Sequence, residues 1–242
     1  MSYDSYSFMG GESIKESFSA NAVEDETTEL ELAVNVLGIA LKAAAEADGR
    51  GKYALVAVIF AHLHSRLLSD NNDIHAVARN FSSESRASII RTYYLAHTAL
   101  KRHDLLPPAP IESSALFAAA KSGRANLLAV FGGQGNVEEY FDELVVLFNT
   151  YEAHARNFIT QGALTLAHHS SSSEAQANYS SKIDVLGWLA NAGSRPSTEH
   201  LLATHLSLPL IGLTQLTNYY ITFKILEKTP GELRDMLAGE LG

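Results

Sequence analysis

Residues 127–141 read LLAVFGGQGNVEEYF, and this stretch decides the fold class of the chain. The apolar run at 127–131 is typical of a buried β-strand, the glycines after it indicate a tight turn, and apolar residues from Val137 onward recur at helical spacing. A strand, a glycine-rich turn and a helix N-terminus bring several backbone N–H groups to one place, where the helix dipole also favours negative charge. The stretch therefore predicts an α/β unit with a site for an anion.

Composition limits the classes of function that remain. The chain has 242 residues, of which 46% are hydrophobic, enough for a substantial core. Its formal net charge is −9 and no stretch gathers Lys and Arg, so we expect no nucleic-acid partner. The absence of cysteine excludes disulfides, thiolate metal sites and a cysteine nucleophile. With no leader pattern and no long apolar run, we expect a cytoplasmic protein without membrane contact.

Changes in composition and a run of prolines divide the chain into four segments. Residues 1–27 are rich in acids, Ser and Gly and predict a disordered acidic tail. Residues 28–106 predict a helical N-terminal region, and the prolines at 107–112 predict a stiff hinge. Residues 113–242 hold the strand, the glycine turn and further helices. The expected architecture is mostly α.

Helical periodicity and capping signals locate the other elements. Residues 27–45 and 53–68 predict helices buried on most sides, although the β-branched run of the second could also form a strand. Ser207 is the expected cap of a long buried helix at 207–227, and Thr229 with Glu232 forms a capping box for a short one. Further helices are predicted at 73–81, 83–103, 113–123, 137–148 and 182–190, and polar loops at 168–181 and 191–200.

Four stretches carry a resemblance to a known family. SALFAAAKSGRANLLAVFGGQGNVEEYFDELVVLFNTY (114–151), VLGWLA (185–190), LSLPLIGLTQLTNYYITFKIL (206–226) and TPGELRDML (229–237) together resemble the start of the acetyltransferase domain in the β subunit of fungal fatty acid synthase. NNDIHAVARNF (71–81) resembles the helical region before that domain. The resemblance implies that 113–242 is the N-terminal portion of the acyltransferase domain, an incomplete α/β core that ends before the nucleophile elbow.

The resemblance also assigns roles within the glycine turn. It implies that the backbone N–H of Gln134 donates to the oxyanion formed when a thioester carbonyl is attacked, a contribution of about 3 kcal/mol. Gly132, Gly133 and Gly135 would let the backbone approach the acyl group in this substrate-binding turn. The local pattern alone also fits a structural turn, because it has neither the spacing of a dinucleotide fingerprint nor the Lys-Ser/Thr of a phosphate loop.

The chain departs from the family at its catalytic serine. It contains no Gly-x-Ser-x-Gly sequence, and in the family the elbow would follow just after Gly242. We therefore expect the 242-residue chain alone to be inactive as an acetyltransferase. Two alternatives remain: a noncatalytic truncated paralogue that acts as an assembly or interaction protein, and a relative from a secondary-metabolite fatty acid synthase.

The whole enzyme implied by the resemblance takes acetyl coenzyme A as its substrate and has no tightly bound cofactor. Acetyl would pass to the serine and then to an acyl carrier protein. The implied partners are that carrier, the fatty acid synthase α subunit and the remainder of the β subunit.

Histidines elsewhere in the chain offer no replacement site. His168 and His169 are adjacent and cannot both face one site, and no acid is placed to orient His200 or His205. His62 and His64 lie two residues apart, on opposite sides of a helix, so we expect no bound metal. We expect Trp188, Tyr219 and Tyr220 to be aromatic residues of the core and not to form a ligand-binding cage.

Overall fold

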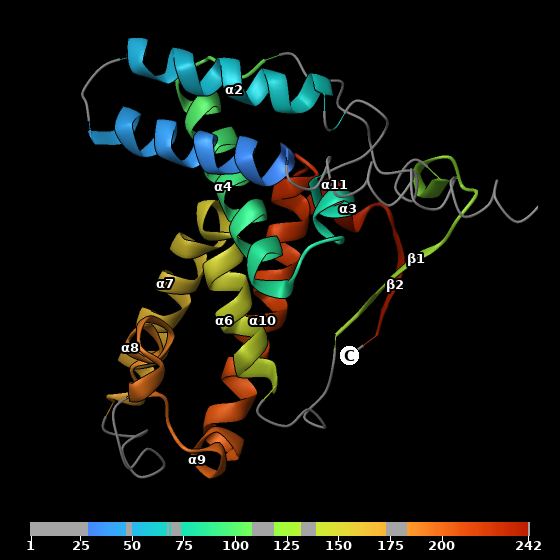
Figure 1. The fold of residues 1–242 in the computed structure, drawn as a ribbon. Coiled ribbons are helices and arrows are strands. Elements are labelled where there is room, and N and C mark those ends of the chain that lie inside the picture. Colours follow the sequence, from blue (N-terminus) through green and yellow to red (C-terminus); the bar gives the residue numbers. More distant parts are fainter. Residues whose placement is uncertain are drawn as a thin grey trace, which may run out of the picture. The chain divides into compact units, whose positions relative to one another are not determined.

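The computed structural model describes residues 29–46, 50–66, 68, 74–107, 119–131, 139–172 and 183–241 (Figure 1). They belong to two compact units, one within Met1–Pro110 and the other within Ile111–Gly242. Helices dominate, and the described strands form a small two-stranded sheet, so the predicted fold class is confirmed. The predicted acidic tail, most of the proline hinge and the whole turn at 132–135 lie outside the described residues. The four predicted segment boundaries stay predictions.

The first unit is built from helices. The segment at 29–46 is helical, and it is followed by η1 (Arg50–Lys52), α2 (Tyr53–Arg66), α3 (Ile74–Ala78) and α4 (Ser83–Arg102). The Ser82 hydroxyl caps α4 by accepting a hydrogen bond from the backbone N–H of Ser85 at 3.2 Å. The core of this unit consists of apolar residues from every helix: Leu30, Val34, Leu37, Val56, Phe60, Leu63, Ile74, Ala78, Ile89, Ile90, Tyr93, Tyr94, Ala96 and Leu100.

The expectation that the first two helices are buried on most sides is wrong. Residues 53–66 do form a helix and not a strand, but each of the two helices buries only one side. Ile39 is 71% exposed on the helix at 29–46, and Val58 is 66% exposed on α2. The described part of this unit has too few elements to cover the outer face of either helix.

The second unit combines helices with the sheet. Its elements are β1 (Leu127–Val130), α6 (Glu139–Thr150), α7 (Glu152–Ser170), α8 (Val185–Ala190), η2 (Ala192–Ser194), α9 (Thr198–Leu202), α10 (Thr204–Ile225), α11 (Pro230–Arg234) and β2 (Leu237–Leu241). Helices α6, α7 and α10 pack against one another and enclose the core (Figure 1). The apolar stripe predicted for α6 is confirmed, because Tyr140, Phe141 and Leu144 are buried in that core. Gly123, at φ 71°, follows the helical residues 119–121, as predicted.

Several predictions in this unit are wrong, and one of them is the loop at 191–200, which contains η2 and the start of α9. Helix α7 continues through His168 and His169 to Ser170, where a loop was expected. Helix α10 begins at Thr204, so Ser207 lies within the helix and is only 8% exposed. Ala203, and not Ser207, is the N-cap of α10, and its carbonyl accepts the first helical hydrogen bonds without a side-chain cap. The capping box of Thr229 and Glu232 at α11 is confirmed.

The sheet contains a strand that the sequence did not predict. Strand β2 pairs with β1 in parallel, and the two strands are separated by about 110 residues (237 − 127). A parallel pair needs a crossover between its strands, and here the helices from α6 to α11 form that connection. One neighbour of β1 is therefore supplied within residues 1–242.

Candidate functional site

The carboxyl end of the sheet is the described feature that lies nearest in sequence to the predicted site. Val130, the last residue of β1, pairs with Leu241, the last residue of β2. Because the two strands are parallel, the segments that follow them both leave the sheet at its carboxyl end. The turn with Gly132, Gly133, Gln134 and Gly135 lies outside the described residues and follows Phe131 in the sequence. Open α/β sheets bind ligands beyond the carboxyl ends of their strands.

The pairing of the two strands contains one irregularity. Leu127 pairs with Leu237 and Leu128 pairs with Gly239, so Ala238 is an extra residue on β2. A Cβ added to Gly239 would lie 3.4 Å from Cδ2 of Leu128. A glycine at this position lets the Leu128 side chain lie close against the neighbouring strand.

Helix α6, which follows the turn, is fixed to other helices through its first residues. The Tyr140 hydroxyl donates a hydrogen bond of 2.7 Å to the Leu201 carbonyl, and the Thr214 hydroxyl donates one of 3.3 Å to the Tyr140 carbonyl. Asn218 of α10 donates to the Glu143 carboxylate at 2.6 Å. The helix end beyond the glycine turn therefore has a fixed position relative to α10.

The charges at the start of α6 limit what kind of anion this end can accept. Glu139 and Asp142 lie in the first turn, where carboxylates already interact favourably with the helix dipole. Asp142 forms an ion pair with Arg195, whose guanidinium carbon lies 5.1 Å from the centroid of the Phe141 ring. A permanent, multiply charged anion such as phosphate would be repelled by these acids.

Tyr140 has a structural role beside this site. Burial raises the pKa of its phenol to about 12, although the nearby Arg195 acts in the opposite direction. The hydroxyl therefore stays protonated near neutral pH and donates to the Leu201 carbonyl. It is not suited to serve as a general base.

The predicted core aromatics of the second unit lie in packed positions. Trp188 is 9% exposed, and its ring centroid lies 6.3 Å from that of Phe141. Tyr220 stacks on Phe158 at 4.5 Å, and the Tyr219 hydroxyl donates to the Pro230 carbonyl at 3.1 Å.

Four histidines of the second unit lie near the ends of helices. His168 and His169 end α7 with ring centroids 5.7 Å apart, and the rings of His200 and His205 are 6.4 Å apart. In the part of the chain that the structure describes, no group of three or more His, Asp or Glu residues could hold a metal ion.

Sequence reasoning missed two histidine–tyrosine pairs in the first unit. His64 Nε2 lies 3.0 Å from the Tyr93 hydroxyl, whereas His62 is exposed on another side of α2. His75 Nε2 lies 2.8 Å from the Tyr94 hydroxyl. Burial, and then the positive charge of His97, lower the pKa of His64. No signal in the sequence links residues of α2 and α3 to these tyrosines.

Comparison with known proteins identifies the family. The profile of the N-terminal domain in fatty acid synthase subunit beta matches residues 6–100. Fatty acid synthase subunit beta of Saccharomyces cerevisiae is 34% identical over 229 residues, which are 91% of this chain and 11% of that protein. The Schizosaccharomyces pombe protein of the same name is 33% identical over 93% of this chain and 11% of its own length. The fatty acid synthase beta subunit aflB of Emericella nidulans is 40% identical over 76% of this chain and 8% of its own length.

These matches confirm the resemblance that the sequence motifs indicated. The chain belongs to the family of fungal fatty acid synthase β subunits and matches their N-terminal region. It spans about a tenth of the length of these relatives. Among its described helices, none combines the length and apolar character needed to cross a bilayer.

Proposed function

We propose that this chain forms the first part of the acetyltransferase domain of a fungal fatty acid synthase β subunit, acting in fatty acid synthesis. In this proposal it supplies the oxyanion-binding turn and not the nucleophile. The relatives carry the name fatty acid synthase subunit beta. The proposed partners are the rest of the β subunit, the α subunit and an acyl carrier protein, and the proposed location is the cytoplasm.

The pairing of Val130 with Leu241 is the observation that carries this proposal. A nucleophile elbow is a sharp turn between a strand and a helix. If an elbow follows β2, its serine leaves the sheet at the edge where the glycine turn follows β1. An oxyanion donor and a nucleophile must both lie about 3 Å from the reacting carbonyl group, and neighbouring parallel strands supply that proximity.

In this proposal the turn donates one hydrogen bond to the reacting carbonyl oxygen. The serine oxygen attacks the thioester carbon of acetyl coenzyme A while a base takes the serine proton. The backbone N–H of Gln134 donates to the carbonyl oxygen as it becomes negative. When the intermediate collapses, the coenzyme A thiol leaves with that proton and an acetyl-serine ester remains. The thiol of the carrier's phosphopantetheine arm then attacks the ester and regenerates the serine.

Substitutions at Gln134 in the complete β subunit test this role. A proline removes the backbone N–H, so Gln134→Pro should lower acetyl transfer by roughly a hundredfold or more. Gln134→Ala keeps the N–H and serves as the matched control, with a smaller loss expected. Transfer from labelled acetyl coenzyme A to carrier is measured as hydroxylamine-sensitive label. Equal transfer by the proline variant and the wild type would exclude Gln134 as the donor.

The 242-residue chain alone provides a second test. Without a serine elbow it should form no hydroxylamine-sensitive adduct with acetyl coenzyme A. Stoichiometric acetylation of this chain would show that its nucleophile lies within residues 1–242. A complete subunit that fails to be acetylated would favour the noncatalytic alternative.

A further inference from the structure

A partly open hollow lies between the helix at 29–46 and α4. Its volume is about 410 Å³, within the range of ~300–1,000 Å³ that is typical of small-molecule sites. Four residues of each helix line it: Gly38, Leu41, Lys42 and Ala45 on one side, and Ser88, Arg91, Thr92 and Leu95 on the other. Within each set, the residues follow one another at helical spacing, so each helix presents one face to the hollow.

Short side chains leave this space open. A Cβ added to Gly38 would lie 3.5 Å from Cγ2 of Thr92, so the two helices approach each other closely at this position. Ala45 and Ser88 also line the hollow, and longer side chains at these positions would fill it. The buried residues of α4, such as Tyr93, lie on another face, so the hollow is separate from the core.

The lining combines two cations and two hydroxyl groups with an apolar part. Lys42 comes from one helix, and Arg91, Ser88 and Thr92 come from the other. The apolar part consists of Leu41, Ala45 and Leu95. None of these described lining residues is acidic, although the whole chain has a formal net charge of −9. The hollow is therefore suited to a ligand with an anionic end and an apolar end.

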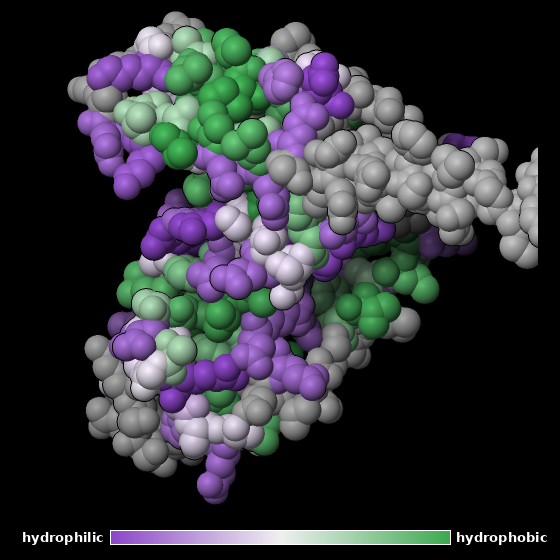
Figure 2. Space-filling view, viewed as in Figure 1, coloured by the Kyte–Doolittle hydropathy of each residue, from purple (hydrophilic) through white to green (hydrophobic). Residues whose placement is uncertain are grey.

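The hollow differs from the outward side of the same helix. Leu32 and Val36 are exposed on that side. Figure 2 shows hydrophobic residues gathered over α2 and its neighbouring helix. The combination of cations and hydroxyl groups is thus a local property of the hollow.

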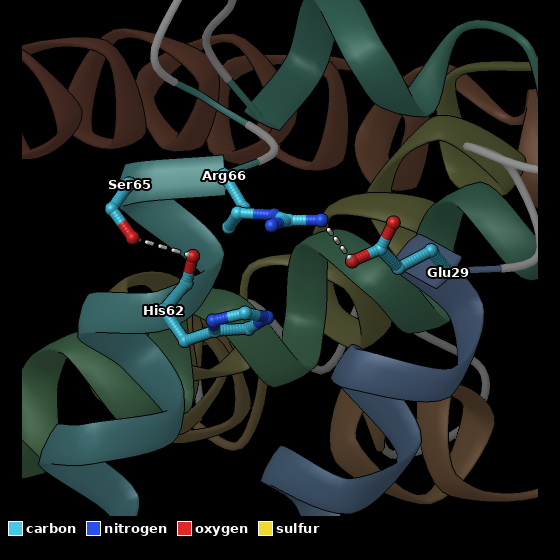
Figure 3. Close-up of polar contacts among 4 residues, drawn as sticks. All are labelled: Glu29, His62, Ser65 and Arg66. Carbon is cyan, nitrogen blue, oxygen red and sulfur yellow. Dashed lines mark hydrogen bonds and ion pairs between the residues drawn. The ribbon is translucent and has the colours of Figure 1, made fainter.

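The charge of Lys42 has no structural role among the described residues. Other basic side chains of this unit connect parts of the fold: Arg66 of α2 lies 3.9 Å from Glu29 between the nearest charged atoms (Figure 3). Arg86 donates a hydrogen bond of 3.2 Å to the Ala78 carbonyl. Lys42 has no ion-pair partner in the described part of the chain, so its ammonium group can bind an external anion.

We propose that this hollow binds a phosphate monoester that carries an apolar group. Lysine and arginine both bind phosphate, and arginine can donate two parallel hydrogen bonds to it. With the hydroxyls of Ser88 and Thr92, the lining offers more donors than the two oxygens of a carboxylate need, and it matches the three terminal oxygens of a phosphate monoester. The apolar group of the ligand contacts the apolar part of the lining. This site is independent of the proposed acetyl transfer.

Titration of the 242-residue chain with hexyl phosphate tests this site. At pH 7.5 the phosphate group is mainly a dianion, and the chain should bind one equivalent. Inorganic phosphate should bind about tenfold or more weakly, because burial of two methylenes contributes about that factor. Hexanoate should also bind more weakly than hexyl phosphate, because it has less charge and fewer acceptor oxygens. Isothermal titration calorimetry measures the three affinities.

Substitutions locate the bound ligand. Lys42→Gln and Arg91→Gln should each weaken the binding of hexyl phosphate about tenfold or more, whereas Lys52→Gln, at an exposed position outside the hollow, should leave it unchanged. Ala45→Met fills the hollow without removing a charge and should also weaken binding about tenfold. Ala43→Met, at an exposed position outside the hollow on the same helix, is its control. Circular dichroism verifies that each variant folds.

Several results would overturn the proposal. One is the absence of saturable binding of hexyl phosphate. Equal affinities for inorganic phosphate and hexyl phosphate would show that the apolar part contributes nothing, and equal affinities for hexanoate and hexyl phosphate would remove the preference for phosphate. Binding that Lys42→Gln, Arg91→Gln and Ala45→Met leave unchanged in folded protein would place the ligand elsewhere.

Discussion

Val130 and Leu241 are register partners at the end of a parallel strand pair, although about 110 residues separate them in the chain (241 − 130 = 111). This pairing places Val130, two residues before the glycine turn in sequence, next to the last residue of β2. Any chemistry that needs groups from both segments depends on this pairing. The pairing can be tested independently of activity.

An engineered disulfide tests the register of the sheet. Ala129 pairs with Glu240, and neighbouring strands place paired Cα atoms within the range that a disulfide spans. Ala129→Cys with Glu240→Cys should therefore oxidise readily to an internal disulfide, visible as a mobility shift without reductant. Ala129→Cys with Gly239→Cys is the control, because adjacent residues of a strand point to opposite faces. Faster cross-linking in the control pair would contradict the register.

Two helical glycines should respond in opposite ways to alanine. A Cβ at Gly162 of α7 would lie 2.6 Å from Cδ1 of Leu213, a buried residue of α10. Gly162→Ala should therefore lower the free energy of unfolding by about 1–3 kcal/mol through overpacking. At Gly212 nothing lies within 4 Å of the added atom, so Gly212→Ala should raise it by about 0.5–1 kcal/mol. Urea unfolding followed by circular dichroism measures both changes, and equal effects would contradict the close packing of α7 on α10.

His64 should make the first unit less stable in acid. Its pKa is lowered in the fold, chiefly by burial, so the unfolded chain binds the proton more readily than the folded chain. The free energy of unfolding should fall as pH drops below the unfolded value of 6.5 and towards the lowered pKa. His64→Gln should reduce this pH dependence, whereas His62→Gln, at an exposed position of the same helix, should retain it. Unfolding curves at several pH values between 5 and 8 make the comparison, and identical curves for the wild type and His64→Gln would refute it.

The capping box of α11 should also have a measurable effect. Thr229→Ala removes the hydroxyl that accepts from the Glu232 N–H at 3.2 Å, and the expected loss is about 1 kcal/mol. Thr229→Ser keeps an acceptor and should retain most of the stability. The Thr229 backbone N–H and then its hydroxyl lower the pKa of Glu232, so the contribution of this carboxylate is present at neutral pH and is lost in acid. Thermal unfolding should show that the stability of Thr229→Ala falls less with decreasing pH than that of the wild type, which would support this assignment.

Local signals predicted most helices correctly because caps and apolar periodicity are short-range properties. Thr229 and Glu232 form the expected capping box, and Tyr140 and Phe141 lie on the expected buried face of α6. The predicted strand at the opening motif is also confirmed. Each of these features depends on residues within a few positions of one another.

Features that depend on distant partners were missed. Strand β2 contains Gly239 and Glu240 and no β-branched residue, so its extended form comes from pairing with β1. Serine is a favoured capping residue, but α10 begins three residues before Ser207, and this side chain is buried within the helix. Apolar content predicted that the helix at 29–46 and α2 are buried on most sides, whereas Ile39 and Val58 are exposed. The roles of Gln134 and its neighbouring glycines stay predictions.

The long connection between β1 and β2 has a consequence for the order in which the second unit folds. During synthesis β1 leaves the ribosome well before β2, and its partner becomes available only after α6 to α11 have been made. Closing so long a loop has an entropic cost that a two-stranded sheet alone offsets poorly. We expect the helices to form first and to bring the strand ends together. Pulse-labelled hydrogen exchange during refolding should then show protection of α6, α7 and α10 before protection of Leu128 and Ala129, and the reverse order would contradict this sequence of events.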